Sequence, residues 1–253
     1  MNKLLTLLKK SWLPPLSVLV GFALWELIVV VFQVPVWVFP RASVAIKALF
    51  ANWSVLYPHL LITVQALLIG YLLAVAVGIF LAVLLVNFPV IEKALTPYIL
   101  FAVTFPAVAL VPILMLWFGF GITVKFIPVM IGSGALIMMN ALTGFSDIDP
   151  LYIDLMKSLK ATRYREMIDV RFPAALPSIF TGLILGAILG IITTVAAEFV
   201  GGSTGLGNRL AYYATTLRTD IMFAIIILLA VMAISFYTAI RLISIKVLQI
   251  YRR

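Results

Sequence analysis

Long apolar runs separated by short polar segments make up most of the chain. A helix needs about 20 mostly apolar residues to cross the roughly 30 Å hydrocarbon core of a bilayer. Runs of this kind occupy residues 15–32, 60–86, 98–118, 126–145, 178–200 and 221–243. Helices are expected because a segment in lipid must satisfy its own backbone polar groups. The pattern therefore predicts an all-α integral membrane protein with about six transmembrane helices.

The apolar pattern is not interrupted by a polar linker long enough to hold a second domain, so residues 1–253 are predicted to form one transmembrane domain. The third run is irregular, because it contains Pro106 and Pro112. A proline inside a helix removes a hydrogen bond and bends the axis. Such breaks persist in membranes where neighbouring helices or a cavity satisfy the freed carbonyls. We therefore predict that a solute pathway follows Phe105, Pro106 and Pro112.

A charged segment separates the fourth and fifth runs and reads DLMKSLKATRYREMIDVRFPAALP over residues 154–177. It holds five of the 18 lysines and arginines of the chain. Just before it, Asp149 and Pro150 form a typical N-cap and first-turn pair, which predicts a helix over about 151–159. Leucines recur on this helix at intervals of four residues, which predicts an apolar stripe.

A second short helix is predicted after the first, with Thr162 as its N-cap and with Phe172 and Pro173 closing it. The segment is therefore expected to form two amphipathic helices joined by a turn at the membrane surface. An apolar stripe in water needs a cover, which either the lipid surface or a partner protein supplies.

Composition and charge support a membrane protein and indicate its orientation. Hydrophobic residues make up 64% of the chain and charged residues 11%. With the N-terminus inside, inner segments hold 13 of the 18 lysines and arginines, which predicts that both termini are cytoplasmic. The net charge of +9 is explained by this bias and by an anionic inner leaflet, so we expect no nucleic-acid partner. The basic N-terminal segment has no small-residue cleavage site, which predicts a retained first helix.

Several chemistries are disfavoured by the sequence. The chain contains no cysteine, which excludes disulfides and cysteine-ligated metals. It has no G-x-x-x-x-G-K-[ST] phosphate loop, so any energy from ATP must come from another chain. Clusters of His, Asp or Glu with metal-ligand spacing are absent from the sequence as well. A membrane-embedded enzyme is therefore the less favoured class.

Two carboxylates lie within apolar runs, where ionisable residues usually face a cavity or a partner. Glu198, near the outer end of the fifth run, is either a gate or pathway residue or a structural partner of Arg209, Arg218 or the amides of GGSTGLG. For Glu26, in the first run, we favour a structural pairing with a neighbouring helix. Gly182, Gly186 and Gly190 form a small-residue face that lets two helices approach closely, and we predict that it lies at a dimer interface. These glycines are spaced by four residues.

The blocks VFPRAS, HLLITVQALLIGYLLAVAVGI, FPAVALVPILMLWFGFGITVKF, PAALPSIFTGL and AAEFVGGSTGLG occur in this order. With the charged segment, they resemble the permease subunits of bacterial ABC importers, specifically the nitrate, sulfonate, taurine and thiamine-precursor group. That family has a cytoplasmic loop patterned E-A-A, three residues, G, nine residues, I-x-L-P. Here 154–156, Lys160 and 170–173 occupy this frame with its spacing intact.

The resemblance implies a type I ABC importer permease fold in the bacterial cytoplasmic (inner) membrane, with the chain working as a homodimer. It also implies two ATP-binding cassette ATPase subunits, which hold ATP and Mg, and an extracytoplasmic solute-binding protein. No cofactor is expected on this chain. The charged segment would form the coupling helices that dock on the ATPase. The ATPase-coupling residues would be Asp154, Leu155, Met156, Leu159, Lys160, Ala161, Arg163, Val170, Phe172 and Pro173, and the pathway or gate residues Phe105, Pro106, Pro112 and Glu198.

Two departures from the family pattern affect these expectations. Lys160 stands where the family has glycine, so either the two loop helices are continuous or a strained turn is tolerated, at about 1 kcal/mol. Leu155 and Met156 replace the two alanines, and this variant resembles the pyrimidine and thiamine-precursor branch more than the taurine branch. We therefore prefer a pyrimidine or related vitamin precursor over a sulfonate, taurine or nitrate as the solute. The alternative is an ATP-independent secondary transporter or channel.

Overall fold

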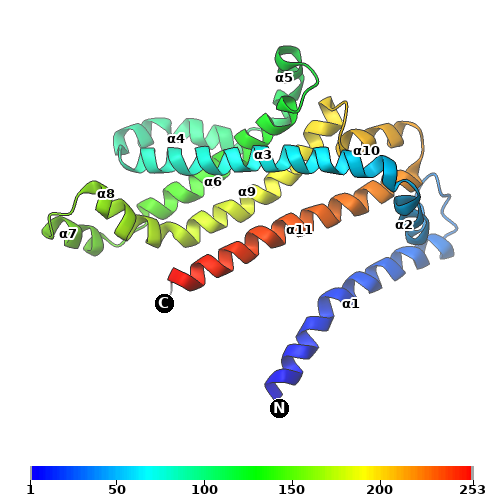
Figure 1. Cartoon of the computed structure of the whole chain (residues 1–253), viewed down its shortest axis with the longest axis horizontal. Helices are drawn as coiled ribbons and strands as arrows, with labels where there is room; N and C mark the ends of the chain where they lie inside the picture. The colour runs from blue at the N-terminus through cyan, green and yellow to red at the C-terminus, as the bar shows by residue number, and fades with distance from the viewer. Residues whose placement is uncertain (1, 252–253) are drawn as a thin grey trace. The chain divides into compact units, whose positions relative to one another are not determined.

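The computed structural model describes the backbone of residues 2–251 and the side chains of residue 13 and of residues 15–251. Every regular element in this part of the chain is a helix (Figure 1). The elements are α1 (Asn2–Val31), α2 (Ala42–Ala51), α3 (Trp53–Val86), α4 (Pro89–Thr104), η1 (Ala107–Leu110), α5 (Val111–Phe118), α6 (Thr123–Ser146), α7 (Pro150–Ser158), α8 (Arg163–Arg165), η2 (Glu166–Arg171), α9 (Phe172–Gly201), α10 (Leu206–Thr215) and α11 (Thr219–Tyr251). The predicted all-α membrane fold is confirmed.

Five of the six predicted apolar runs each fall on one helix, and the third, 98–118, is divided among α4, η1 and α5. Among the described residues, four stretches are long and apolar enough to cross a bilayer: Trp53–Val86, Thr123–Ser146, Arg163–Gly201 and Thr219–Tyr251. A bent pair of helices, Pro89–Thr104 with Ala107–Phe118, makes a fifth crossing if it is one span. The first predicted run corresponds to the apolar stretch Pro15–Val31, which is shorter than the other four.

The contacts of the chain divide it into two compact units that interleave in sequence. One unit comprises Met1–Pro58 and Arg209–Leu229, and the other comprises His59–Asn208 and Ala230–Arg253. Each is described by itself below. The prediction of a single transmembrane domain stays a prediction.

Aromatic rings and a helix cap hold the first unit together. Trp25 of α1 lies 5.6 Å from Phe223 of α11, centroid to centroid, and donates a hydrogen bond of 2.9 Å to the carbonyl of Pro40. The Glu26 carboxylate accepts from the Ser43 amide at 3.0 Å and from its hydroxyl at 2.8 Å. Ser43 lies in the first turn of α2, whose free amides and dipole favour a carboxylate. The predicted structural role of Glu26 is confirmed.

In the second unit, α6 packs closely against α9 along the glycine face of α9. A Cβ added at Gly182 would lie 2.7 Å from the Cβ of Asn140, and one at Gly186 would lie 2.8 Å from Cγ1 of Ile137. A Cβ at Gly190 would lie 2.9 Å from the hydroxyl of Ser133. These glycines therefore allow close contact within one chain, so the interpretation of this face as a dimer interface is wrong.

The third predicted run is broken rather than kinked. It begins at Pro89, nine residues earlier than expected, and α4 ends at Thr104. The axis then turns by 85° before the next helical stretch. Pro106 lies at this break, as predicted. Pro112 lies in the first turn of α5, where amides have no hydrogen-bond partner within the helix, so a proline costs no bond there. Pro112 therefore begins a helix, and the prediction that it interrupts one is wrong.

Candidate functional site

The charged loop, residues 147–171, joins α6 to α9 and begins with the predicted helix. The Asp149 carboxylate accepts a hydrogen bond of 2.9 Å from the amide of Leu151, so Asp149 is the N-cap of α7. Leu151, Leu155 and Leu159 are exposed by 71%, 54% and 67%. The apolar stripe predicted from the leucine spacing is therefore present and uncovered in the isolated chain.

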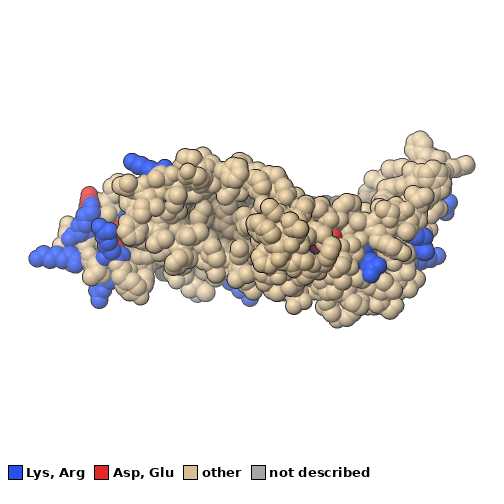
Figure 2. All heavy atoms as spheres, turned by 90° about the horizontal axis from the view of Figure 1, so that it is seen from above, with Lys and Arg blue, Asp and Glu red and all other residues tan. Residues whose placement is uncertain are grey.

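Positive charge surrounds this stripe. Figure 2 shows blue side chains gathered at its left-hand end, where α7 and α8 lie, beside a mostly tan surface. The exposed cations of this patch are Lys157, Lys160, Arg163 and Arg165. Asp154 forms an ion pair with Lys157 at 2.9 Å, with both side chains 68% exposed, so the pair adds little stability. The loop thus offers apolar and cationic groups together.

Lys160 forms a tight turn between the two loop helices. Its φ is 52°, in the left-handed region. Its amide donates to the carbonyl of Lys157, and the amide of Ala161 donates to the carbonyl of Met156, each at 2.9 Å. This pair of bonds is the Schellman motif, which usually has glycine at the left-handed position. Of the two alternatives for this position, the structure has the strained turn, and the helices are not continuous.

The second half of the loop begins as predicted and ends differently. The Thr162 hydroxyl accepts from the amide of Arg165 at 3.3 Å and caps α8. The helix then widens into the π-helical η2 and runs without a stop into α9. The prediction that Phe172 and Pro173 close it is wrong. The wider π turn accommodates Pro173, which has no amide hydrogen to donate and whose ring would clash with the preceding turn of an α-helix.

Arg171 ties this continuous helix to the end of α6, a contact that the sequence did not indicate. Its guanidinium donates to the Glu166 carboxylate at 2.7 Å and to the carbonyl of Phe145 at 2.8 Å. The rings of Phe145 and Phe172 lie 6.2 Å apart. Val170 and Pro173 are half-buried beside them. The loop is therefore joined directly to both α6 and α9.

The bend after α4 packs against the far ends of α6 and α9. Val111 and Leu114 of α5 are buried together with Val124 and Ala197. The ring of Phe105, the last residue before Pro106, lies 5.3 Å from that of Phe101. The predicted pathway segment is therefore held at its α5 end, next to the part of α9 that carries Glu198. Whether solute follows this segment stays a prediction.

Glu198 is fully buried, and one cation among the described side chains pairs with it. Its Oε2 accepts from the Thr63 hydroxyl at 2.8 Å and from the amide of Gly207 at 3.0 Å. Its Oε1 lies 3.7 Å from Nζ of Lys125, which is also buried. The bond from Gly207 matches the predicted alternative of a partner among the GGSTGLG amides. The sequence did not identify Lys125, because the two residues lie far apart in the chain.

The residues around Glu198 also hold the loop of residues 202–207. Lys125 Nζ donates to the carbonyl of Thr204 at 2.6 Å and to its hydroxyl at 2.8 Å. The amide of Gly205 donates to Nδ1 of His59 at 3.0 Å, and the amide of Leu206 donates to the hydroxyl of Thr63 at 2.8 Å. Gly205 has a φ of 102°, and a Cβ there would collide with the Glu198 carboxylate. The "Glu198 cluster", His59, Thr63, Lys125 and Glu198, thus fastens this loop to α3, α6 and α9.

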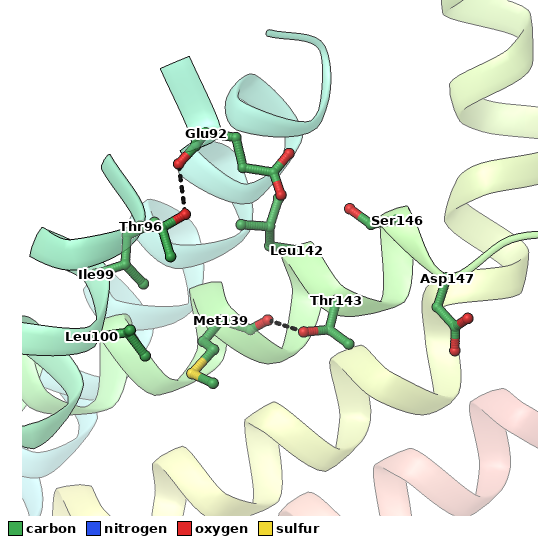
Figure 3. A pocket seen from close by; sticks show the side chains of 9 residues that line it. All are labelled: Glu92, Thr96, Ile99, Leu100, Met139, Leu142, Thr143, Ser146 and Asp147. Atoms are coloured by element: carbon green, nitrogen blue, oxygen red, sulfur yellow. Dashed lines mark hydrogen bonds between the residues drawn. The ribbon is translucent and has the colours of Figure 1, made fainter. Parts of the chain in front are cut away.

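A pocket of about 510 Å³ lies between α4 and α6, close to the charged loop (Figure 3). One face of each helix lines it. Two carboxylates, those of Glu92 and Asp147, belong to this lining. The sequence did not indicate this pocket, because neither carboxylate lies inside an apolar run.

A helical membrane chain with a charged, partly apolar loop of this construction has the features of a transport permease. Residues 74–249 match the family of binding-protein-dependent transport system inner membrane components, and the chain belongs to that family. It is thus the permease subunit of an ABC importer, a multi-pass protein of the inner membrane.

Relatives share most of the chain. A probable ABC transporter permease protein of Haemophilus influenzae is 28% identical over 227 residues, covering 90% of this chain and 93% of that protein. The formylaminopyrimidine transport permease protein ThiX of Halalkalibacterium halodurans is 27% identical, covering 90% and 91%. The taurine transport permease protein TauC of Escherichia coli is 31% identical, covering 71% and 66%.

Solved structures share the fold. An inward-facing structure of the MetNI methionine ABC transporter matches with a TM-score of 0.66 at 16% identity, covering 78% of this chain and 96% of that chain. An amino acid ABC transporter with histidines matches with a TM-score of 0.61 at 19% identity, with the same coverage. The expected type I importer permease fold is confirmed.

Proposed function

We propose that two copies of this chain form the membrane channel of an importer for a small organic solute. Two ATP-binding cassette subunits would bind below the membrane and an extracytoplasmic solute-binding protein above it, with both termini of the chain in the cytoplasm. ATP and Mg would be held by the ATPase subunits, and this chain would have neither cofactor nor catalytic residues. Residues 1–253 would act as one transmembrane domain.

The observation that carries this proposal is the construction of the charged loop. The stripe of Leu151, Leu155 and Leu159 is exposed and flanked by cations, as a helix that docks in a protein groove requires. A helix that lay on lipid would need the same stripe, but the tie from Arg171 to the carbonyl of Phe145 adds a second feature. It joins the loop to two membrane helices, so that docking has a mechanical consequence.

The mechanism follows from these connections. ATP binding would close the ATPase pair and move α7, whose end at Lys160 turns sharply into α8. Because η2 continues into α9, the displacement would reach α9 along one helix. It would reach α6 through Arg171 and the ring of Phe172. The bend at Phe105 and Pro106 and the Glu198 cluster, at the other end of α6 and α9, would then open or close the pathway.

The solute is proposed to be a pyrimidine or a related vitamin precursor rather than a sulfonate, taurine or nitrate. The Leu155–Met156 variant of the loop supports this choice, and ThiX, a formylaminopyrimidine permease, is similar over 90% of the chain. TauC, whose name specifies taurine, is similar over a smaller part, 71%.

The proposal is tested by recovering the tagged chain from its native membrane in mild detergent. ATP hydrolysis by the eluate is then measured with and without periplasmic extract. We expect an ATP-hydrolysing subunit to be recovered in a one-to-one ratio, with activity that rises when the extract is added. Recovery of the chain alone, with solute flux that needs no ATP, would instead identify a secondary transporter or channel.

A further inference from the structure

We propose that the α4–α6 pocket is a solute site that selects an organic solute bearing an amine or other N–H donors and rejects anions. This inference rests on the proposed import function and specifies the class of solute. The site lies on the same helix α4 that leads to the bend at Phe105 and Pro106, at the opposite end of that helix.

Apart from the hydroxyl of Ser146, which can donate or accept, the hydrogen-bonding side chains of the lining present acceptors. The hydroxyl of Thr96 already donates to the carbonyl of Glu92 at 2.8 Å, and that of Thr143 donates to the carbonyl of Met139 at 2.9 Å (Figure 3). Each hydroxyl therefore presents only lone pairs to the pocket. The carboxylates of Glu92 and Asp147 also accept only. A protonated amine or an amidine satisfies these groups, whereas a sulfonate or bicarbonate brings further acceptors.

The charges of the lining also favour a cationic solute over an anionic one. The lining contributes two carboxylates and no cation, and neither carboxylate takes part in an ion pair within the described residues. Glu92 lies in the first turn of α4, where the helix dipole favours a negative charge. Asp147 follows the last turn of α6, where the dipole of that helix disfavours one. Both carboxylates attract a cation and repel an anion, and a cation near Asp147 would offset the unfavourable dipole of α6.

The rest of the lining fits an apolar or aromatic body. Ile99 and Leu142 are buried at 9% exposure each, and Leu100 and Met139 complete the apolar wall. Thioether and aliphatic groups pack readily against a flat ring. A volume of about 510 Å³ lies within the usual range of small-molecule sites, roughly 300 to 1,000 Å³. The pocket therefore combines an acidic, acceptor-lined part with an apolar part.

The absence of cysteine makes a direct test possible, because one introduced thiol is the only one in the chain. Thr143→Cys, nearly isosteric, places it in the pocket. In the full-length chain in lipid nanodiscs, labelling rates are measured with two methanethiosulfonate reagents, one bearing trimethylammonium and one bearing sulfonate. We expect the ratio of cationic to anionic labelling to fall by about tenfold when Glu92→Gln and Asp147→Asn are added. Tyr164→Cys, in the charged loop outside the lining, is the control, and its ratio should not change.

Protection from labelling tests the solute class with two probes of similar size. Benzamidine, a cation with an amidine donor, should slow labelling of Thr143→Cys, and benzenesulfonate should not. A labelling ratio that is unaffected by the two neutral substitutions, or equal protection by both probes, would overturn the inference. These measurements need neither ATP nor a partner. Failure of the importer proposal would appear in the pull-down, and failure of the solute class would appear here.

Discussion

Lys160 holds a left-handed backbone conformation at the end of α7, with a φ of 52°. The Schellman bonds around it are fully formed, so the turn is made in spite of the lysine side chain. Glycine adopts this conformation without the steric penalty of a Cβ, which is about 1 kcal/mol. The family pattern, with glycine at this position, has the residue that the observed geometry prefers.

We therefore expect Lys160→Gly to raise the thermal unfolding temperature of the purified chain slightly and to leave complex assembly intact. The gain corresponds to about 1 kcal/mol at the turn. Lys157→Gly is the matched control, since it places glycine inside α7 and should lower the unfolding temperature by a similar free energy. Loss of assembly in Lys160→Gly would show that the turn depends on the lysine side chain.

At the same scale, the sequence correctly predicted hydrogen bonds between residues that are close together in the chain. Asp149 and Thr162 were predicted as caps, and both caps form within three residues. The contacts of Lys125 were not predicted, because its partners, Thr204 and Glu198, lie more than 70 positions away in the chain. No periodicity encodes such a pair.

At the scale of elements, the loop of residues 202–207 depends on helices from three parts of the chain. Lys125 compensates the buried charge of Glu198 and also binds Thr204. Removing one partner of a buried pair leaves an unpaired charge and typically destabilises by about 3–5 kcal/mol. The cluster is thus a fastening between the loop and the membrane helices.

We expect Lys125→Met to lower the unfolding temperature strongly and to expose the 202–207 loop to protease. The double variant Lys125→Met with Glu198→Gln should lose less than the sum of the single variants, because neither charge is left alone. Arg218→Met, which breaks the exposed pair with Asp220, is the control and should have little effect. Additive losses in the double variant would contradict the pairing.

The positions of the elements were predictable, whereas their junctions were not. Apolar runs marked the four long spans and the bent pair of helices, whereas the first run corresponds to the shorter apolar stretch Pro15–Val31. The continuity of η2 with α9 was missed, because Pro173 reads as a stop signal in sequence and a π turn gives no signal of its own. The 85° turn at Pro106 was foreseen only as a kink. After the turn, α5 packs against α6 and α9, and such contacts between distant residues give no local sequence signal.

At the scale of the whole molecule, family membership defines an importer permease. In the proposed function, its energy comes from an ATPase on another chain. The proposed lever connects that source to the pathway through α7, η2 and α9. Its point of contact would be the exposed stripe of α7, and Leu155 and Leu159 are its central members. Replacing them should break docking without disturbing the membrane core, because neither side chain is buried.

The most direct test measures solute uptake and ATP hydrolysis in the same proteoliposomes, with the complex recovered by pull-down. For Leu155→Asp with Leu159→Asp, we predict that uptake is lost and that ATP hydrolysis no longer responds to the loaded binding protein. The variant should retain the unfolding temperature of the unmodified chain. Unchanged uptake at an unchanged ratio to ATP hydrolysis would contradict the account, because the loop would then not couple the two.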